Sequence, residues 1–160
     1  MICNESFIVA YNKLFTWLYE HEGIDGLREF WTLLAEAMSF RFEQLTRTKG
    51  LAGLVEYWAE TLSAEKAACT LKYTMGKNGA CLTLYIRDCP SRRRLHQASQ
   101  SICPVYCDHC KTIYGTILSS LGYSMTLTKI GDNSCLIQIR ESACSEAGDT
   151  PGPSGTSLTP

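Results

Sequence analysis

The stretch CTLKYTMGKNGACLTLYI, residues 69–86, decides the fold class. Apolar residues alternate with polar ones on both sides of Gly76-Lys-Asn-Gly79, a pattern typical of strands with one buried face. The pair Asn78-Gly79 favours the tight turn of a β-hairpin. Pro90 cannot donate a hydrogen bond to a neighbouring strand, so the second strand should end close to it. The sequence therefore predicts an antiparallel hairpin.

The chain before this hairpin has the apolar spacing of helices. Three apolar stripes with helical period cover residues 7–18, 27–45 and 51–62, and Gly23 and Gly50 interrupt them. The stripes are rich in aromatic side chains, which indicates helices that pack on one another or on a sheet. We expect these helices to contribute side chains to the hydrophobic core rather than catalytic or binding residues.

The chain after the hairpin contains a helix and a second hairpin. Residues 91–102 are polar and indicate a loop or a short helix. A helical stripe then runs from Ile113 to Leu121 and ends at Gly122. Alternation returns around a turn at residues 131–134. The order hairpin, helix, hairpin predicts an antiparallel sheet with a helix across one face, so the expected fold class is α+β.

These elements predict one folded domain and a tail. Residues 1–141 form the α+β domain, with a helical part at 1–67 and a ββαββ part at 68–141. Residues 142–160 are rich in Ser, Gly, Pro and Thr, which indicates a disordered tail.

Composition narrows the class of function. The 160 residues are 45% hydrophobic and have a formal net charge of −1, which gives no electrostatic argument for nucleic acid or an anionic membrane as a partner. No apolar run approaches the ~18 residues that indicate a membrane span. The start lacks the basic region and cleavage pattern of a secretory signal. We therefore expect a soluble, cytoplasmic protein. The sequence carries no signal for an oligomeric state.

The chain has nine cysteines, an odd number that argues against a disulfide framework in a reducing compartment. Three of them lie in Cys103-Pro-Val-Tyr-Cys107-Asp-His-Cys110. Pro104 is suited to the first position of a helix. If a helix begins there, the three thiols share one face of its first two turns. The helix dipole would favour the thiolate form, which binds metal or attacks an electrophile.

The cluster predicts a metal or cofactor site completed by a fourth thiol. Cys89 at the end of a predicted strand is the best candidate, and Cys135 at the start of another is the next. Thiolates at these positions are suitable ligands for zinc or an iron–sulfur cluster. His109 on a regular helix would point away from its neighbouring cysteines, so we rank it below them. The alternative is that the thiols only pack as small apolar side chains.

Arg92, Arg93 and Arg94 lie between Cys89 and the cluster. The simpler interpretation is that these three arginines are exposed to solvent and have no specific partner. The sharper one is a clamp for the carboxylate of a small-molecule ligand, because guanidinium groups match carboxylates in geometry.

The segment from Leu82 to Ile139 resembles a known family. The features that carry the resemblance are Leu84-Tyr-Ile-Arg-Asp-Cys89-Pro90, the cysteines at Cys107 and Cys110, and Gly131-Asp-Asn-Ser-Cys135 leading into a strand. They are similar to the L-2-amino-thiazoline-4-carboxylic acid hydrolase family. The final Gly-x-x-x-Cys strand also looks like the end of 4-vinyl reductase domains, which bind small molecules and in some members zinc.

Two functions follow from these observations. The first is a binding module for a small molecule or a metal, with a cysteine-rich site. The second, implied by the hydrolase resemblance, is hydrolysis of a small cyclic amidine or thiazoline carboxylate. Cys107 or Cys110 would then be the nucleophile or a metal ligand, and residues 92–94 would hold the substrate carboxylate. We favour the binding module, because no Cys–His–Asp arrangement is apparent in the sequence.

Overall fold

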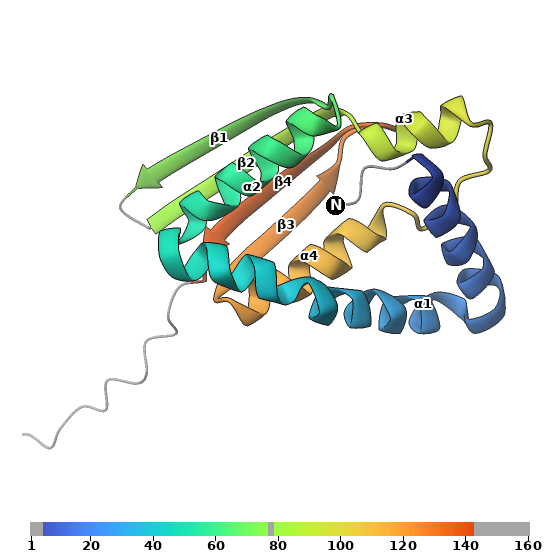
Figure 1. Ribbon diagram of the computed structural model, residues 1–160, viewed down its shortest axis with the longest axis horizontal. Helices are drawn as coiled ribbons and strands as arrows, with labels where there is room; N and C mark the ends of the chain where they lie inside the picture. Colours follow the sequence, from blue (N-terminus) through green and yellow to red (C-terminus); the bar gives the residue numbers. More distant parts are fainter. Residues whose placement is uncertain (1–4, 77–78, 143–160) are drawn as a thin grey trace, which may run out of the picture.

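A computed structural model describes residues 5–76 and 79–142 of the chain. The fold is α+β, as predicted, with two N-terminal helices followed by a four-stranded antiparallel sheet (Figure 1). The elements are α1 (Glu5–Lys49), α2 (Leu51–Ala64), β1 (Ala68–Gly76), β2 (Gly79–Asp88), α3 (Pro90–Gln97), α4 (Asp108–Ser120), β3 (Tyr123–Lys129) and β4 (Cys135–Glu141). The expected disordered tail lies almost wholly outside the described residues.

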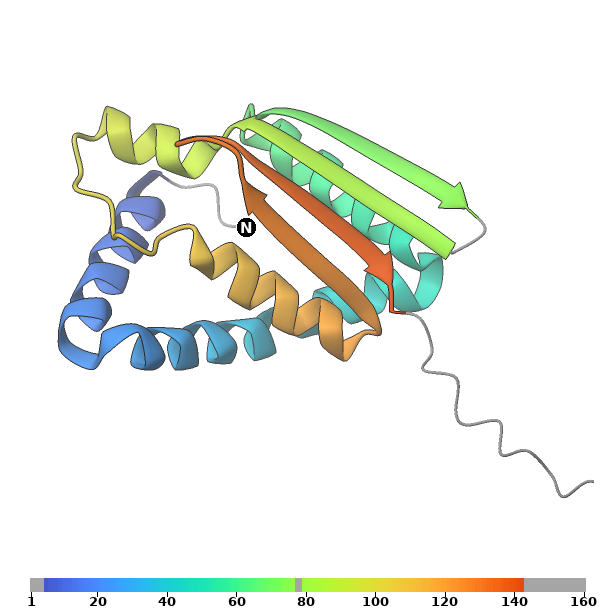
Figure 2. The same ribbon diagram turned by 180° about the vertical axis from the view of Figure 1, so that it is seen from behind.

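The sheet has the strand order β1-β2-β4-β3, and every neighbouring pair is antiparallel. One register row crosses all four strands through Leu71, Leu84, Ile137 and Leu127. These side chains belong to the face that packs on the helices. Within the described residues no helix covers the opposite face of the sheet (Figure 2). The period-two alternation of the sequence therefore identified the buried face correctly.

Helix α1 bends at Gly23, where the sequence predicted an interruption. Gly23 has φ 70° and ψ −169°, a conformation outside the helical region that glycine adopts at low cost. The bend gives α1 two arms with different directions (Figure 1). Phe15 on the first arm and Trp31 on the second meet edge to face, with ring centroids 5.4 Å apart. Both arms can therefore contribute to the same aromatic cluster.

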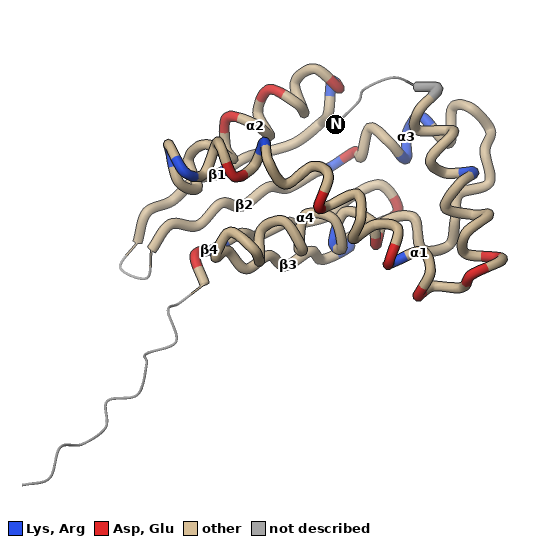
Figure 3. Tube along the Cα trace, turned by 60° about the horizontal axis from the view of Figure 1, so that its bottom comes forward, with Lys and Arg blue, Asp and Glu red and all other residues tan. Residues whose placement is uncertain are grey.

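Charged residues are mixed along the visible helices, with Lys and Arg positions next to Asp and Glu positions (Figure 3). Helix α3 places the three consecutive arginines beside the end of β2. Among the described helices, none combines the length and the apolar character needed to cross a bilayer.

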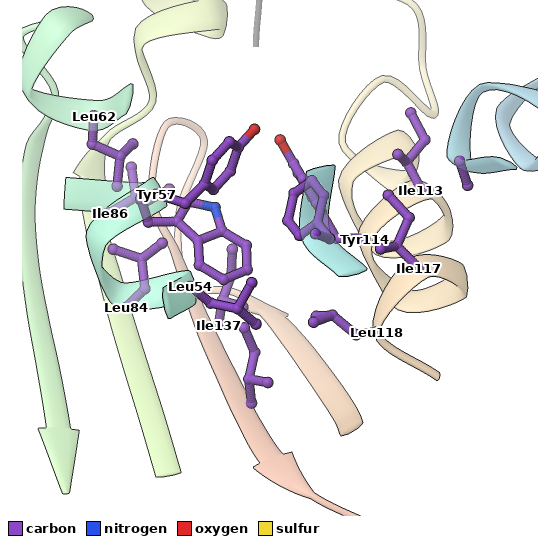
Figure 4. Close-up of a cluster of buried hydrophobic side chains, with 14 of the residues drawn as sticks. Leu54, Tyr57, Leu62, Leu84, Ile86, Ile113, Tyr114, Ile117, Leu118 and Ile137 are labelled. Atoms are coloured by element: carbon purple, nitrogen blue, oxygen red, sulfur yellow. The ribbon is translucent and has the colours of Figure 1, made fainter. Parts of the chain in front are cut away.

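The core lies between the sheet and helices α2 and α4. Figure 4 shows Leu54 and Tyr57 of α2 facing Ile117 and Leu118 of α4 above the strands. Helix α2 also packs closely on α1 at Gly53, where an added Cβ would lie 2.6 Å from the backbone oxygen of Leu45. A side chain at this position would therefore force the two helices apart.

Candidate functional site

Four of the five predicted cysteines line a single pocket. They are Cys89, Cys107, Cys110 and Cys135. They meet at one end of the sheet, where β2 ends, β4 begins and α4 starts. The pocket has a volume of about 70 Å³ and mainly apolar walls. A water molecule needs roughly 10–15 Å³ on this scale, so the pocket is suited to a small group.

Asn133, in the turn between β3 and β4, forms hydrogen bonds with two other residues of the pocket wall. Its backbone oxygen accepts a hydrogen bond of 2.7 Å from the backbone N–H of Cys89. Its side-chain Oδ1 accepts one of 3.2 Å from Nε of Arg92. The turn is therefore joined to the β2–α3 junction, although 41 residues separate Asn133 from Arg92. Sequence analysis predicted the turn but not this contact.

Cys103 lies apart from the other four cysteines, because the helix does not begin where the sequence predicted. Helix α4 starts at Asp108, and residues 104–107 form turns instead. The N–H of Tyr106 donates to the backbone oxygen of Cys103 at 2.9 Å. The expected helix face shared by Cys103, Cys107 and Cys110 is therefore wrong. Cys103 is only 2% exposed, and its backbone N–H donates to Oδ1 of Asn12 on α1 at 3.0 Å.

The three arginines have different surroundings. Arg93 forms an ion pair of 2.6 Å with Asp88 and donates to the backbone oxygen of Glu65 at 3.3 Å, so its guanidinium is engaged in holding the fold. Arg94 is half-buried and is not part of the pocket wall. Arg92 is part of that wall, and its Nη1 lies 3.6 Å from the Cys107 sulfur. Lys129 adds a second cation to the pocket wall.

His109 also lines the pocket and contacts the thiol beside it. Its Nε2 lies 3.3 Å from the Cys110 sulfur, so the expectation that this ring points away from its neighbouring cysteines is wrong. Its Nδ1 is hydrogen-bonded to the backbone oxygen of Tyr106. The imidazole is surrounded by the rings of Phe15 at 5.6 Å, Trp31 at 6.4 Å and Tyr106 at 4.9 Å. The bend in α1 therefore completes this aromatic cage from both arms.

Burial controls the ionisation of the pocket groups. It raises the pKa of Cys110 well above the usual thiol range, and the neighbouring Cys89 adds to this effect. Burial likewise raises the pKa of Cys89 and raises that of Cys135 to about 11. The pKa of His109 is lowered, because burial disfavours the imidazolium. Near neutral pH these three thiols are therefore protonated, and the imidazole is uncharged.

Thiols line the pocket, but the described residues contain no preassembled group of metal ligands. Sulfur donors are the ligand type that zinc and iron–sulfur clusters use. However, in the described part of the chain no three Cys, His, Asp or Glu side chains are placed to share one ion. The zinc or iron–sulfur cofactor stays a prediction.

Glu65 is a pocket residue that sequence analysis missed. It is the C-cap of α2, is only 1% exposed and lines the same pocket as the cysteines. The negative end of the helix dipole makes this an unfavourable place for a carboxylate. The sequence does show an acidic residue shortly after the apolar stripe of a predicted helix. This residue could be recognised as buried only if the end of the helix were known.

The comparisons with known proteins found no matching family model and no matching curated protein. The resemblance to the hydrolase family and to 4-vinyl reductase domains therefore stays a prediction from the quoted motifs.

Proposed function

We propose that the protein binds a small anionic molecule, such as a carboxylate, in the cysteine-lined pocket. The observation that carries this proposal is the position of Arg92. Its guanidinium stands in the wall of a pocket whose other walls are mainly apolar. A cation beside apolar walls favours a ligand with one charged end and one apolar end.

The guanidinium of Arg92 is already held in place. Asn133 accepts from Nε at 3.2 Å, and the Cys107 sulfur accepts from Nη1 at 3.6 Å. A group that is fixed before the ligand arrives loses less conformational entropy on binding. The planar guanidinium is also suited to two parallel hydrogen bonds with a carboxylate. Lys129 supplies a second positive charge at the same pocket. The pocket lining also includes the acidic residues Glu65 and Asp132, so we infer an anionic ligand from the position of Arg92.

The remaining walls favour a compact, weakly polar ligand body. Leu62, Ile86 and Ile137 line the pocket together with the protonated thiols. A protonated thiol behaves largely as a small apolar group. The pocket volume of about 70 Å³ favours a small molecule over a peptide or nucleotide.

Calorimetry with 2-amino-thiazoline-4-carboxylate tests this function, because the family resemblance implies a cyclic amidine carboxylate as the ligand. Arg92→Met should weaken its binding by roughly 10–100-fold, since a hydrogen bond to a charged group contributes about 1.5–3 kcal/mol. The matched control is Arg87→Met. Arg87 donates to Thr70 at 2.8 Å and is not part of the pocket wall, so this change should leave the affinity unaltered.

A second probe, 2-aminothiazoline without the carboxylate, separates the charge from the ring. It should bind more weakly than the carboxylate to the wild-type protein, and Arg92→Met should not weaken it further. Equal affinities for the two probes, or equal effects of Arg87→Met and Arg92→Met, would refute an anion site at Arg92.

A further inference from the structure

Binding alone does not require the contact between His109 and Cys110. A backbone carbonyl oxygen can only accept a hydrogen bond, so the bond to Tyr106 places the imidazole proton on Nδ1. The Nε2 atom then carries a lone pair, which faces the Cys110 sulfur at 3.3 Å. The thiol is the donor in this contact, and its proton already points at a base.

The cage around His109 fixes the orientation of that base. Phe15, Trp31 and Tyr106 surround the ring and hold its orientation. A nucleophile, a base within hydrogen-bond reach and a third group that orients the base are the parts of a catalytic thiol site.

Cys107 has a different neighbour. Its sulfur accepts a hydrogen bond from Arg92, and a guanidinium cannot take up a proton in a protein. Of these two thiols, Cys110 is thus the one whose contact provides a proton acceptor. Both His109 and Cys110 line the pocket that contains Arg92, so a ligand bound there has access to the pair.

We propose that Cys110 is a nucleophile and His109 its general base, acting on small molecules that carry an electrophilic trigonal carbon of an amidine, ester or thioester. This assignment rests on the proposed function in one respect: Arg92 would bind the anionic group of the substrate. The reaction of Cys110 and His109 with the trigonal carbon does not depend on that anionic group.

The reaction balances with water as the second reactant. The Cys110 sulfur forms a bond to the trigonal carbon as its proton moves to Nε2 of His109, and the π electrons move to the substrate nitrogen or oxygen. The bond to the leaving group then breaks, and His109 returns the proton to it. Water attacks the resulting thioester or thioimidate, His109 takes the proton of this water, and the sulfur leaves and regains a proton. The substrate has then gained one water, and the enzyme is unchanged.

Acylation of the full chain by 4-nitrophenyl acetate tests the assignment without a carboxylate in the probe. Release of 4-nitrophenolate is followed by absorbance, and mass spectrometry of peptides locates the acetyl group. The wild-type protein should acquire acetyl on Cys110 before the other cysteines. His109→Gln should slow the reaction about 10²-fold, the lower range for general base catalysis. Cys110→Ser should remove this acetyl thioester.

Cys81→Ser is the matched control, because Cys81 pairs with Arg140 on the sheet face opposite the core and does not line the pocket. It should acylate at the wild-type rate. Early acetylation of Cys107, or equal acetylation of all thiols in the wild-type protein, would overturn the assignment even if a variant failed to fold. An unchanged rate in folded His109→Gln would overturn the role of the base.

Calorimetry of 2-amino-thiazoline-4-carboxylate with Cys110→Ser keeps the two proposals distinct. Retained binding with lost acylation supports both. Absent binding to the wild-type protein with early acylation of Cys110 supports the nucleophile and overturns the anion site.

Discussion

Asn12 joins the first arm of α1 to the segment that leads into the cysteine pocket, and its replacement should be costly. The side chain is only 1% exposed. It donates to the backbone oxygen of Ser101 at 2.7 Å and accepts from the backbone N–H of Cys103 at 3.0 Å. Asn12→Leu keeps the branched shape of the side chain and is compatible with a helix, but it removes both hydrogen bonds and leaves two backbone groups without this partner.

The magnitude follows from the burial of those two groups. The N–H of Cys103 is buried, and losing its partner should cost about 1–3 kcal/mol. The carbonyl of Ser101 belongs to an exposed residue that water can reach, so its loss should cost about 0.5–1.5 kcal/mol. The sum is roughly 1.5–4.5 kcal/mol. For a domain of this size the Tm should fall by roughly 5–15 °C.

Thermal unfolding followed by circular dichroism, with Lys13→Leu as the control, measures this effect. Lys13 is exposed on the same helix, and its replacement should change stability by no more than about 0.5 kcal/mol. Hydrogen exchange adds a local test, since the amide of Cys103 should be protected in the wild-type protein and exchange faster in Asn12→Leu. A Tm within a degree of the control, together with unchanged protection of that amide, would refute the role of Asn12.

Three further predictions concern metal, the C-terminal tail and pH. Elemental analysis of protein purified without oxygen measures bound zinc, or iron with matching sulfide. Cys107→Ser and Cys110→Ser should each lose any bound metal, because an alcohol is a poor ligand for soft metals, whereas Cys69→Ser should retain it. Metal that survives all three changes would exclude a thiolate site here. Truncation after Glu141 should leave the Tm nearly unchanged, since residues 142–160 have almost no large apolar side chains, and a loss of several degrees would show that the tail packs on the domain. Burial raises the pKa of Cys135 from 9.0 to about 11, so the stability from its neutral thiol is present below pH 9 and is lost as the pH rises to about 11. Chemical denaturation should show the free energy of unfolding falling over this range, with a smaller fall in Cys135→Ser; equal falls would contradict the shift.

Local pattern was sufficient for most of the fold. The alternation of Leu82, Leu84 and Ile86 predicted a strand and its buried face, because successive side chains of a strand point to opposite sides wherever the strand lies. The interruption at Gly23 was equally local, since it depends on one backbone conformation that glycine tolerates. Pro90 marked the end of β2 because it has no N–H to donate.

Part of the site also followed from the sequence. Cys89 was predicted at the end of one strand and Cys135 at the start of another, and the antiparallel register brings these two ends together by pairing Ile86 with Cys135. The pairing itself comes from the strand order β1-β2-β4-β3, which the sequence analysis did not predict.

Only the tertiary structure decided which side chains share the pocket. The backbone N–H of Cys103 is hydrogen-bonded to Asn12, 91 residues earlier in the chain. Helix α4 begins at Asp108 rather than at Pro104. His109 faces Cys110 inside a cage that both arms of α1 complete. These outcomes depend on the satisfaction of buried polar groups and on the packing of distant rings, which are properties of the folded chain as a whole. A local window of sequence has no information about such partners.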